Sequence, residues 1–263
     1  MAVSGYATPA GPGAEAPLSL IGEQTASSLL ANVVRVYRRH VGVMLVCSVL
    51  PVLPFLLLME MLEGSAWALL PMAGYLVGLF LGSGALTVAV SDICLGNRPT
   101  LRRAFVRITS GGRWHQLLTT GSLLTLGFYL GLVLLVVPGV WLLVRGLFTS
   151  IIVTLEGRRN IDAIKRSLAL TKGQAWRLTG LTLVPAILLY LLLLLLAVAA
   201  GLLLGLLAPA SPLNEHLIKV IVYAASFGVL TPMMGITMVL LYYDQRARRE
   251  AYDVRELAED LMR

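Results

Sequence analysis

The fold is decided by one apolar stretch, residues 117–155, with the sequence LLTTGSLLTLGFYLGLVLLVVPGVWLLVRGLFTSIIVTL. As one straight helix, its 39 residues would extend about 58 Å at 1.5 Å per residue. The hydrocarbon core of a bilayer is only about 30 Å thick. Pro138-Gly139 lies near the middle, where proline removes a backbone donor and glycine permits a turn. We therefore predict a tight hairpin at these two residues, between helices at about 117–137 and 140–155.

Similar apolar runs without charges lie on both sides of this stretch. A membrane-spanning helix needs about 20 apolar residues, and the runs that meet this length predict six helices, at about 41–60, 66–91, 117–137, 140–155, 178–207 and 218–243. Of all residues, 57% are hydrophobic and 13% are charged, and the mean hydropathy is +0.83. We predict an all-α polytopic membrane protein, and we exclude a disordered chain, a basic nucleic-acid-binding domain and an ordinary water-soluble enzyme.

The basic residues orient the predicted helices. Nineteen of the 21 Lys and Arg precede the first helix, follow the last, or lie in the second-to-third and fourth-to-fifth connections. Six spans place all of these segments on one side, and the positive-inside rule makes that side the cytoplasm, together with both termini. In a five-span count, with Pro138 only a kink, the last two basic groups would change sides.

The ends of the chain differ from its middle. Residues 1–17 are rich in Ala, Gly and Pro, without the basic and apolar regions of a signal peptide, and we expect a flexible cytoplasmic tail. Residues 18–243 form the predicted membrane domain. Residues 244–263 predict a charged cytoplasmic helix with i,i+4 pairs such as Arg246/Glu250. This helix docks either on the protein's own cytoplasmic segments or on a partner.

Basic segments before the predicted hairpins indicate amphipathic helices at the membrane surface. Residues 101–118 and 161–178 share an Ala, an Arg three residues later, a Gly and a Trp, which favours a repeated unit of interfacial helix, span, turn and span; residues 29–45 match weakly. Basic side chains at this level attract anionic lipids, although topology alone also explains them. The candidate contacts to lipid headgroups are Arg107, Lys165, Arg166 and Lys172.

Glycines recur every four residues on three predicted spans. Such a face lets another helix backbone approach closely, either within the chain or from a second copy. The predicted helix-packing glycines are Gly74, Gly78, Gly82, Gly127, Gly131, Gly201 and Gly205.

Arg145 is the single charge within the quoted stretch. Its predicted position is about ten residues from the cytoplasmic helix end, or roughly 15 Å deep. A charge at that depth is costly unless it is paired or hydrated. Three interpretations stay open: Arg145 binds carbonyls freed by the turn at Pro138, it binds the anionic group of a lipid or substrate, or its guanidinium extends to the interface.

The sequence has no recognisable catalytic or metal-binding pattern. His40, His115 and His216 flank predicted spans without ligand spacing, and Cys47 and Cys94 form no disulfide framework. Phosphate-binding loops, a dinucleotide fingerprint and a nucleophile with its base are also missing. We therefore expect no enzymatic activity, no cofactor, no metal and no nucleic-acid partner.

Two motifs and one turn carry a resemblance to a known family. The chain resembles the bacterial multi-pass family called the glycerophosphoryl diester phosphodiesterase membrane region, over roughly residues 30–260. The resemblance implies a six-helix module in the bacterial inner membrane and no catalytic residues. The phosphodiesterase barrel of some members needs about 250 residues, and we expect none here. The similar residues are Leu155, Glu156, Gly157, Ala163, Arg166, Ser167, Leu170, Lys172, Gly173, Trp176, Gly180, Tyr242 to Arg246, Arg248 to Glu250, and Pro138-Gly139 followed by Arg145.

Two functions follow from this architecture. The leading hypothesis is a non-catalytic integral membrane protein, a scaffold or accessory subunit whose partner is another membrane protein or a second copy. The alternative is a transporter or lipid translocator that binds an anionic headgroup near Arg145. A membrane-embedded lipid enzyme is the weakest candidate.

Overall fold

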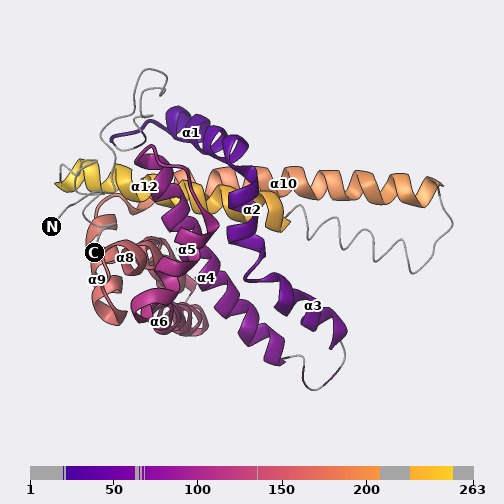
Figure 1. The fold of residues 1–263 in the computed structure, drawn as a ribbon, viewed down its shortest axis with the longest axis horizontal. Helices are drawn as coiled ribbons and strands as arrows, with labels where there is room; N and C mark the ends of the chain where they lie inside the picture. The colour runs from indigo at the N-terminus through magenta and orange to yellow at the C-terminus, as the bar shows by residue number, and fades with distance from the viewer. Residues whose placement is uncertain are drawn as a thin grey trace.

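The structure is a computed structural model that describes residues 20, 22–62, 65, 67, 69–134, 136–207 and 226–250, and this part of the chain is all-helical (Figure 1). The α-helices are α1 (Ala26–Arg39), α2 (Val41–Val49), α3 (Leu53–Met61), α4 (Leu69–Cys94), α5 (Leu101–Thr109), α6 (Arg113–Leu134), α7 (Val136–Arg145), α8 (Thr149–Leu155), α9 (Asn160–Thr171), α10 (Ala175–Leu207) and α12 (Thr231–Glu250). A 3₁₀ turn, η1 (Ser110–Gly112), precedes α6, and a π-helical turn, η2 (Ser226–Leu230), precedes α12.

Helices α4, α6 and α10 are long and apolar enough to cross a membrane. Helices α2 and α3, which meet at a bend of 48°, would together make a fourth crossing. The bend coincides with Pro51, whose missing N–H interrupts the helical hydrogen bonds. The predicted helix over 41–60 is therefore two short helices rather than one straight span.

The predicted hairpin forms, but its turn does not lie at Pro138-Gly139. Helices α6 and α7 pack in an antiparallel register, because Gly139 lies against Leu132 and Leu142 against Gly127, so the chain has already reversed before Pro138. Pro138 lies in the first turn of α7, where its missing N–H removes no intrahelical bond. A Cβ on Gly139 would lie 2.7 Å from the Leu132 backbone nitrogen, so this glycine permits close packing rather than the turn.

The predicted helix over 140–155 is present as the apolar segment Trp141–Leu155, but a turn divides it. Residues 146–148 interrupt it, so that α7 ends at Arg145 and α8 begins at Thr149. At the other boundaries, α4 ends at Cys94 instead of residue 91, and α10 begins at Ala175 instead of residue 178. Helix α12 continues without a break into the charged segment as far as Glu250. The predicted tail over 1–17 and residues 218–225 and 251–263 lie outside the described residues.

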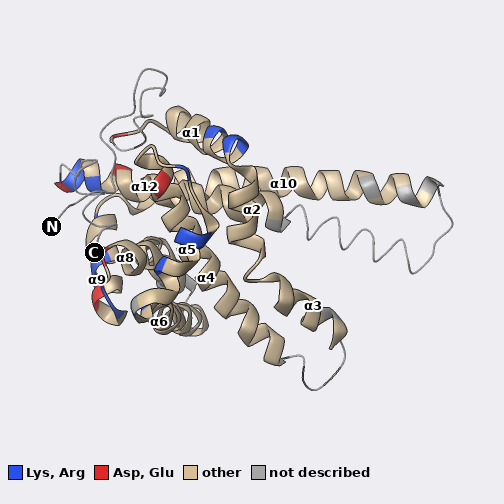
Figure 2. Cartoon of the chain, in the orientation of Figure 1, with Lys and Arg blue, Asp and Glu red and all other residues tan. Residues whose placement is uncertain are grey.

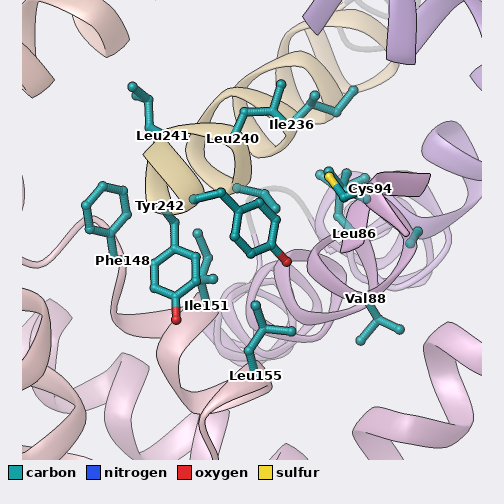
Figure 3. Close-up of a cluster of buried hydrophobic side chains, with 14 of the residues drawn as sticks. Leu86, Val88, Cys94, Phe148, Ile151, Leu155, Ile236, Leu240, Leu241 and Tyr242 are labelled. Atoms are coloured by element: carbon teal, nitrogen blue, oxygen red, sulfur yellow. The ribbon is translucent and has the colours of Figure 1, made fainter. Parts of the chain in front are cut away.

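The core lies where α4, α8 and α12 meet (Figure 3). Tyr242 and Tyr243 of α12 are fully buried, and the Tyr242 ring meets the Phe148 ring edge-on at 5.8 Å between centroids. The Tyr243 hydroxyl shares a hydrogen bond of 2.6 Å with Ser91 Oγ of α4. These contacts fix the end of α12 against both neighbours.

The glycines of α4 form the surface on which α2 and α3 pack. A Cβ on Gly82 would lie 3.1 Å from the Cys47 carbonyl oxygen, a Cβ on Gly78 would collide with the Pro51 carbonyl, and one on Gly74 with the Phe55 ring. Gly127 and Gly131 lie in the α6–α7 contact described above. Gly201 and Gly205 belong to the outer part of α10, and no atom of the described residues lies within 4 Å of a Cβ built on Gly205. The described residues therefore provide no packing partner for Gly205.

Helix α10 is the most exposed of the long helices. Its outer half extends beyond the other described helices (Figure 1). The most apolar window of α10 is 0% buried, whereas 61% of the corresponding window of α4 is buried. Helix α4 is therefore the central helix of the described fold, and α10 presents apolar side chains outward.

Candidate functional site

Charged side chains gather at one end of the helices, where α8 ends, α10 begins and α12 ends (Figure 2). This region, together with α9, is called the charged end below. Two sets of ion pairs and a pair of helix-capping arginines hold it together, and each is described in turn.

The first set surrounds the carboxylate of Asp244, which is 0% exposed. Asp244 Oδ1 accepts hydrogen bonds from the Gln24 backbone nitrogen at 2.7 Å and from Arg248 Nε at 3.0 Å. Asp244 Oδ2 accepts from Arg177 Nη1 at 2.8 Å and from Gln245 Nε2 at 3.3 Å. Four donors thus satisfy one buried charge, as burial of a carboxylate requires.

This Asp244 cluster joins three segments that are far apart in the sequence. The Gln24 carbonyl oxygen accepts from both Arg177 Nη2 and Arg248 Nη2, each at 3.2 Å. Gln245 Nε2 also donates to Gln174 Oε1 at 3.1 Å. The chain before α1, the start of α10 and the end of α12 are consequently fixed to one another.

The second set, the Glu156 cluster, joins α8, α9 and α12. Glu156 accepts hydrogen bonds from Arg166 Nε at 3.2 Å and from the Tyr242 hydroxyl at 2.9 Å. Arg166 Nη1 also lies 2.5 Å from Glu250 Oε1, and Arg246 Nε lies 3.0 Å from Glu250 Oε2. The guanidinium of Arg166 therefore bridges two carboxylates from different helices.

These ion-pair partners shift the pKa values of Glu250 and Arg166. Burial alone would raise the pKa of Glu250, but the hydrogen bonds and charges of Arg166 and Arg246 outweigh it and hold this pKa below its ordinary value of 4.5. Burial alone would lower the pKa of Arg166, but Glu250 and Glu156 hold it above its ordinary value. Both groups are charged at neutral pH.

We expect acidification to release the last turn of α12. Because the pKa of Glu250 is lowered in the folded protein, its stabilising effect is complete above pH 4.5 and is lost as the pH falls through the folded-state value. Hydrogen exchange of residues 246–250, corrected for intrinsic rates, should increase over that range. Glu250→Gln should show the faster exchange already at neutral pH, and an unchanged rate in this variant would contradict the prediction.

Two arginines from other helices cap the C-terminal end of α9. Arg145 Nη2 donates to the Leu168 carbonyl, and Arg145 Nε donates to Thr171 Oγ1 at 3.3 Å. Arg249 donates to the carbonyls of Ala169 and Lys172. Cations at this position satisfy unpaired carbonyls and oppose the negative end of the helix dipole.

The contacts of Arg145 differ from the expected ones. Its guanidinium lies 4.8 Å from the centre of the Trp141 ring and binds carbonyl and hydroxyl groups of α9. The interpretation that Arg145 binds carbonyls freed at Pro138 is wrong, because the helical backbone continues through that proline.

Ser167 of α9 satisfies the backbone at the break between α7 and α8. Its hydroxyl oxygen accepts a hydrogen bond from the Phe148 nitrogen at 3.3 Å and donates one to the Arg145 carbonyl at 2.7 Å. The interruption leaves these backbone groups without helical partners, and a buried group of this kind is costly when unpaired. Helix α9 is thus part of what makes the broken helix stable.

The remaining predicted contacts to lipid headgroups have three different environments. Arg166 is engaged by Glu156 and Glu250, so its charge is neutralised within the protein. Lys165 and Lys172 are exposed. Arg107 lies half-buried on α5, whose Arg103 pairs with the buried Asp92 of α4 at 3.5 Å.

Sequence reasoning missed Asp244 and Glu156 as the centres of the charged end. A signal was present for both, since each carboxylate lies next to the end of an apolar run with arginines close by. A carboxylate in that position pairs with basic residues that topology places at the same level.

Comparisons with protein-family models, with curated proteins and with solved structures find no match to this chain. The family resemblance therefore depends on the sequence motifs alone. Several motif residues nevertheless have structural roles here. Glu156 and Asp244 are the centres of the two clusters, Ala163 is fully buried, and Gly157 and Gly173 have φ values of 66° and 75°, which favour glycine.

Proposed function

We propose that the chain is a non-catalytic multi-pass membrane protein that acts as a scaffold or accessory subunit of a membrane assembly. The observation that carries this proposal is the exposure of α10. Its most apolar window is 0% buried, although the base of the same helix is fixed by Arg177 in the Asp244 cluster. An apolar helix that is fixed at one end and exposed along its length provides a surface on which another transmembrane helix can pack.

The topology is part of the proposal. We propose six crossings, with both termini in the cytoplasm of a bacterial cell and the charged end facing that compartment. The distribution of the basic residues supports this orientation, as does the reversal of the chain between α6 and α7. Reporter fusions at residue 135 and at the carboxyl end test it, and either one on the unexpected side would contradict six crossings.

Photo-crosslinking in native membranes tests the scaffold role. A photoreactive residue at Leu188 or Leu195 of α10, which are 62% and 65% exposed, should yield a discrete protein adduct. The same partner should co-purify stoichiometrically in mild detergent. The fully buried Leu240 is the matched control and should give no intermolecular adduct. A protein that purifies alone, with only lipid adducts on α10, would overturn the proposal.

The alternative of a transporter or lipid translocator has less support in this geometry. It depends on an anion site at Arg145, and the guanidinium of that residue binds the end of α9 and stacks on Trp141. An anion would have to displace these contacts.

A further inference from the structure

A cavity of about 310 Å³ lies between α4, α6 and the break between α7 and α8. Leu79 and Ser83 line it from α4, Thr120 and Leu124 from α6, and Leu143 and Thr149 from the broken helix. No charged side chain of the described residues lines it. Its size lies at the lower end of the range for small-molecule sites in proteins, about 300–1,000 Å³.

Thr149 has an unusual environment in this cavity. Threonines within helices commonly donate their hydroxyl proton to the carbonyl four residues earlier, and five buried threonines do so here, with donor–acceptor distances of 2.8–2.9 Å: Thr87, Thr154, Thr171, Thr182 and Thr237. For Thr149, that carbonyl belongs to Arg145, and it already accepts from Ser167 Oγ at 2.7 Å.

The hydroxyl of Thr149 is therefore left without a partner among the described residues, although Thr149 is only 2% exposed. Burying an unsatisfied hydroxyl is unfavourable, so an acceptor from beyond the described residues would stabilise it. Thr149 is the first residue of α8, after the turn at residues 146–148, and Ser167 of α9 binds the Arg145 carbonyl that would be its usual acceptor.

The cavity wall mixes polar and apolar side chains, and apolar Leu117 and Val153 lie at the same end as Thr120 and Thr149. Thr120 lies at the charged end, where its hydroxyl accepts from the Asn160 nitrogen of α9 at 2.9 Å. Leu124 lies one helical turn further from that end, and Leu79 and Leu143 are also apolar. Leu143 lines the cavity and is 46% exposed, so the wall at this residue reaches the outer surface of an apolar helix.

We propose that this cavity binds one acyl chain of an ester-linked membrane lipid, and that the ester carbonyl accepts a hydrogen bond from Thr149 Oγ1. The leucines provide the surface for the hydrocarbon, and the hydroxyl provides the single donor that an ester requires. In this proposal the acyl chain enters from the lipid phase at Leu143. This site is independent of the proposed scaffold role of α10.

The test uses the full-length protein in vesicles of phosphatidylethanolamine and phosphatidylglycerol. A trace phospholipid carries a diazirine in one chain, in a diester form and in a diether form that lacks the carbonyl. After illumination, mass spectrometry locates the adducts. The diester probe should label peptides containing Leu79, Leu124 or Leu143 more strongly than the exposed leucines of α10, and the diether probe should label them about fivefold less, the factor expected for one hydrogen bond.

Two variants with matched controls decide the outcome. Thr149→Val should reduce diester labelling about fivefold without changing diether labelling, whereas Thr154→Val, a buried threonine of the same helix outside the cavity, should change neither. Leu143→Trp should block labelling by both probes, whereas Leu188→Trp on α10 should not. Two results would overturn the proposal. The first is labelling of the cavity peptides no stronger than that of α10. The second is equal labelling by the diester and diether probes together with unchanged labelling of Thr149→Val.

Discussion

Replacing Asp244 with alanine is expected to destabilise the folded protein by about 3 kcal/mol, because it leaves Arg177 and Arg248 without their shared buried carboxylate. Breaking a buried pair by removing one partner costs about 3–5 kcal/mol. The lower figure applies here, since the two arginine side chains retain 33% and 25% exposure and water compensates part of the loss. The Gln24 backbone nitrogen, in contrast, loses its only charged acceptor.

Reversible denaturation in mixed micelles measures this effect. Glu23→Ala is the control, because Glu23 pairs with the same Arg248 at 2.6 Å but is 64% exposed. An exposed pair of this kind contributes at most about 1 kcal/mol. Equal losses for the two variants would mean that burial of Asp244 does not determine the strength of the cluster.

The second large effect is expected for Gly78→Leu. A Cβ at this position collides with the Pro51 carbonyl oxygen and lies 2.9 Å from the Pro51 carbonyl carbon, both of which are backbone atoms. Backbone cannot rotate away as a flexible side chain does, so α2 and α3 must separate from α4. We expect a loss of about 3 kcal/mol, at the upper end of the usual cost of overpacking.

Gly180→Leu provides the comparison for that measurement. Gly180 is exposed on α10, and no atom of the described chain lies within 4 Å of the position that its Cβ would take. Leucine forms helices better than glycine by up to about 1 kcal/mol, so this variant should be neutral or slightly stabilised. Destabilisation of both variants to the same extent would show that helix contact at Gly78 is not the cause.

Much of the helical architecture is predictable from sequence, because apolar run length and charge placement are local properties. The long apolar helix α10 and the glycine surface of α4 follow from such patterns. The turn cannot be placed correctly in the same way, because a proline in the first helical turn and a proline in a loop have the same local sequence. Only the packing of Gly139 on Leu132 distinguishes them.

The contacts of Arg145 could not be predicted for a different reason. Its partners come from α9, more than 20 positions later in the chain, and they reach it because the helix breaks at residues 146–148. Neither the break nor the docking of α9 leaves a periodic pattern in the sequence. The same applies to Asp244, because the Gln24 backbone nitrogen that donates to its carboxylate lies 220 positions away in the sequence.

The dependence of the helix break on Ser167 has a consequence for biosynthesis. The Arg145 carbonyl leaves the ribosome 22 residues before the hydroxyl that binds it. When α7 and α8 have reached the insertion machinery, polar backbone groups between them are therefore still unpaired. Lipid alone does not satisfy such groups. We therefore expect this pair to integrate stably only after α9 has emerged and docked, so that insertion depends on translation of the next 22 residues.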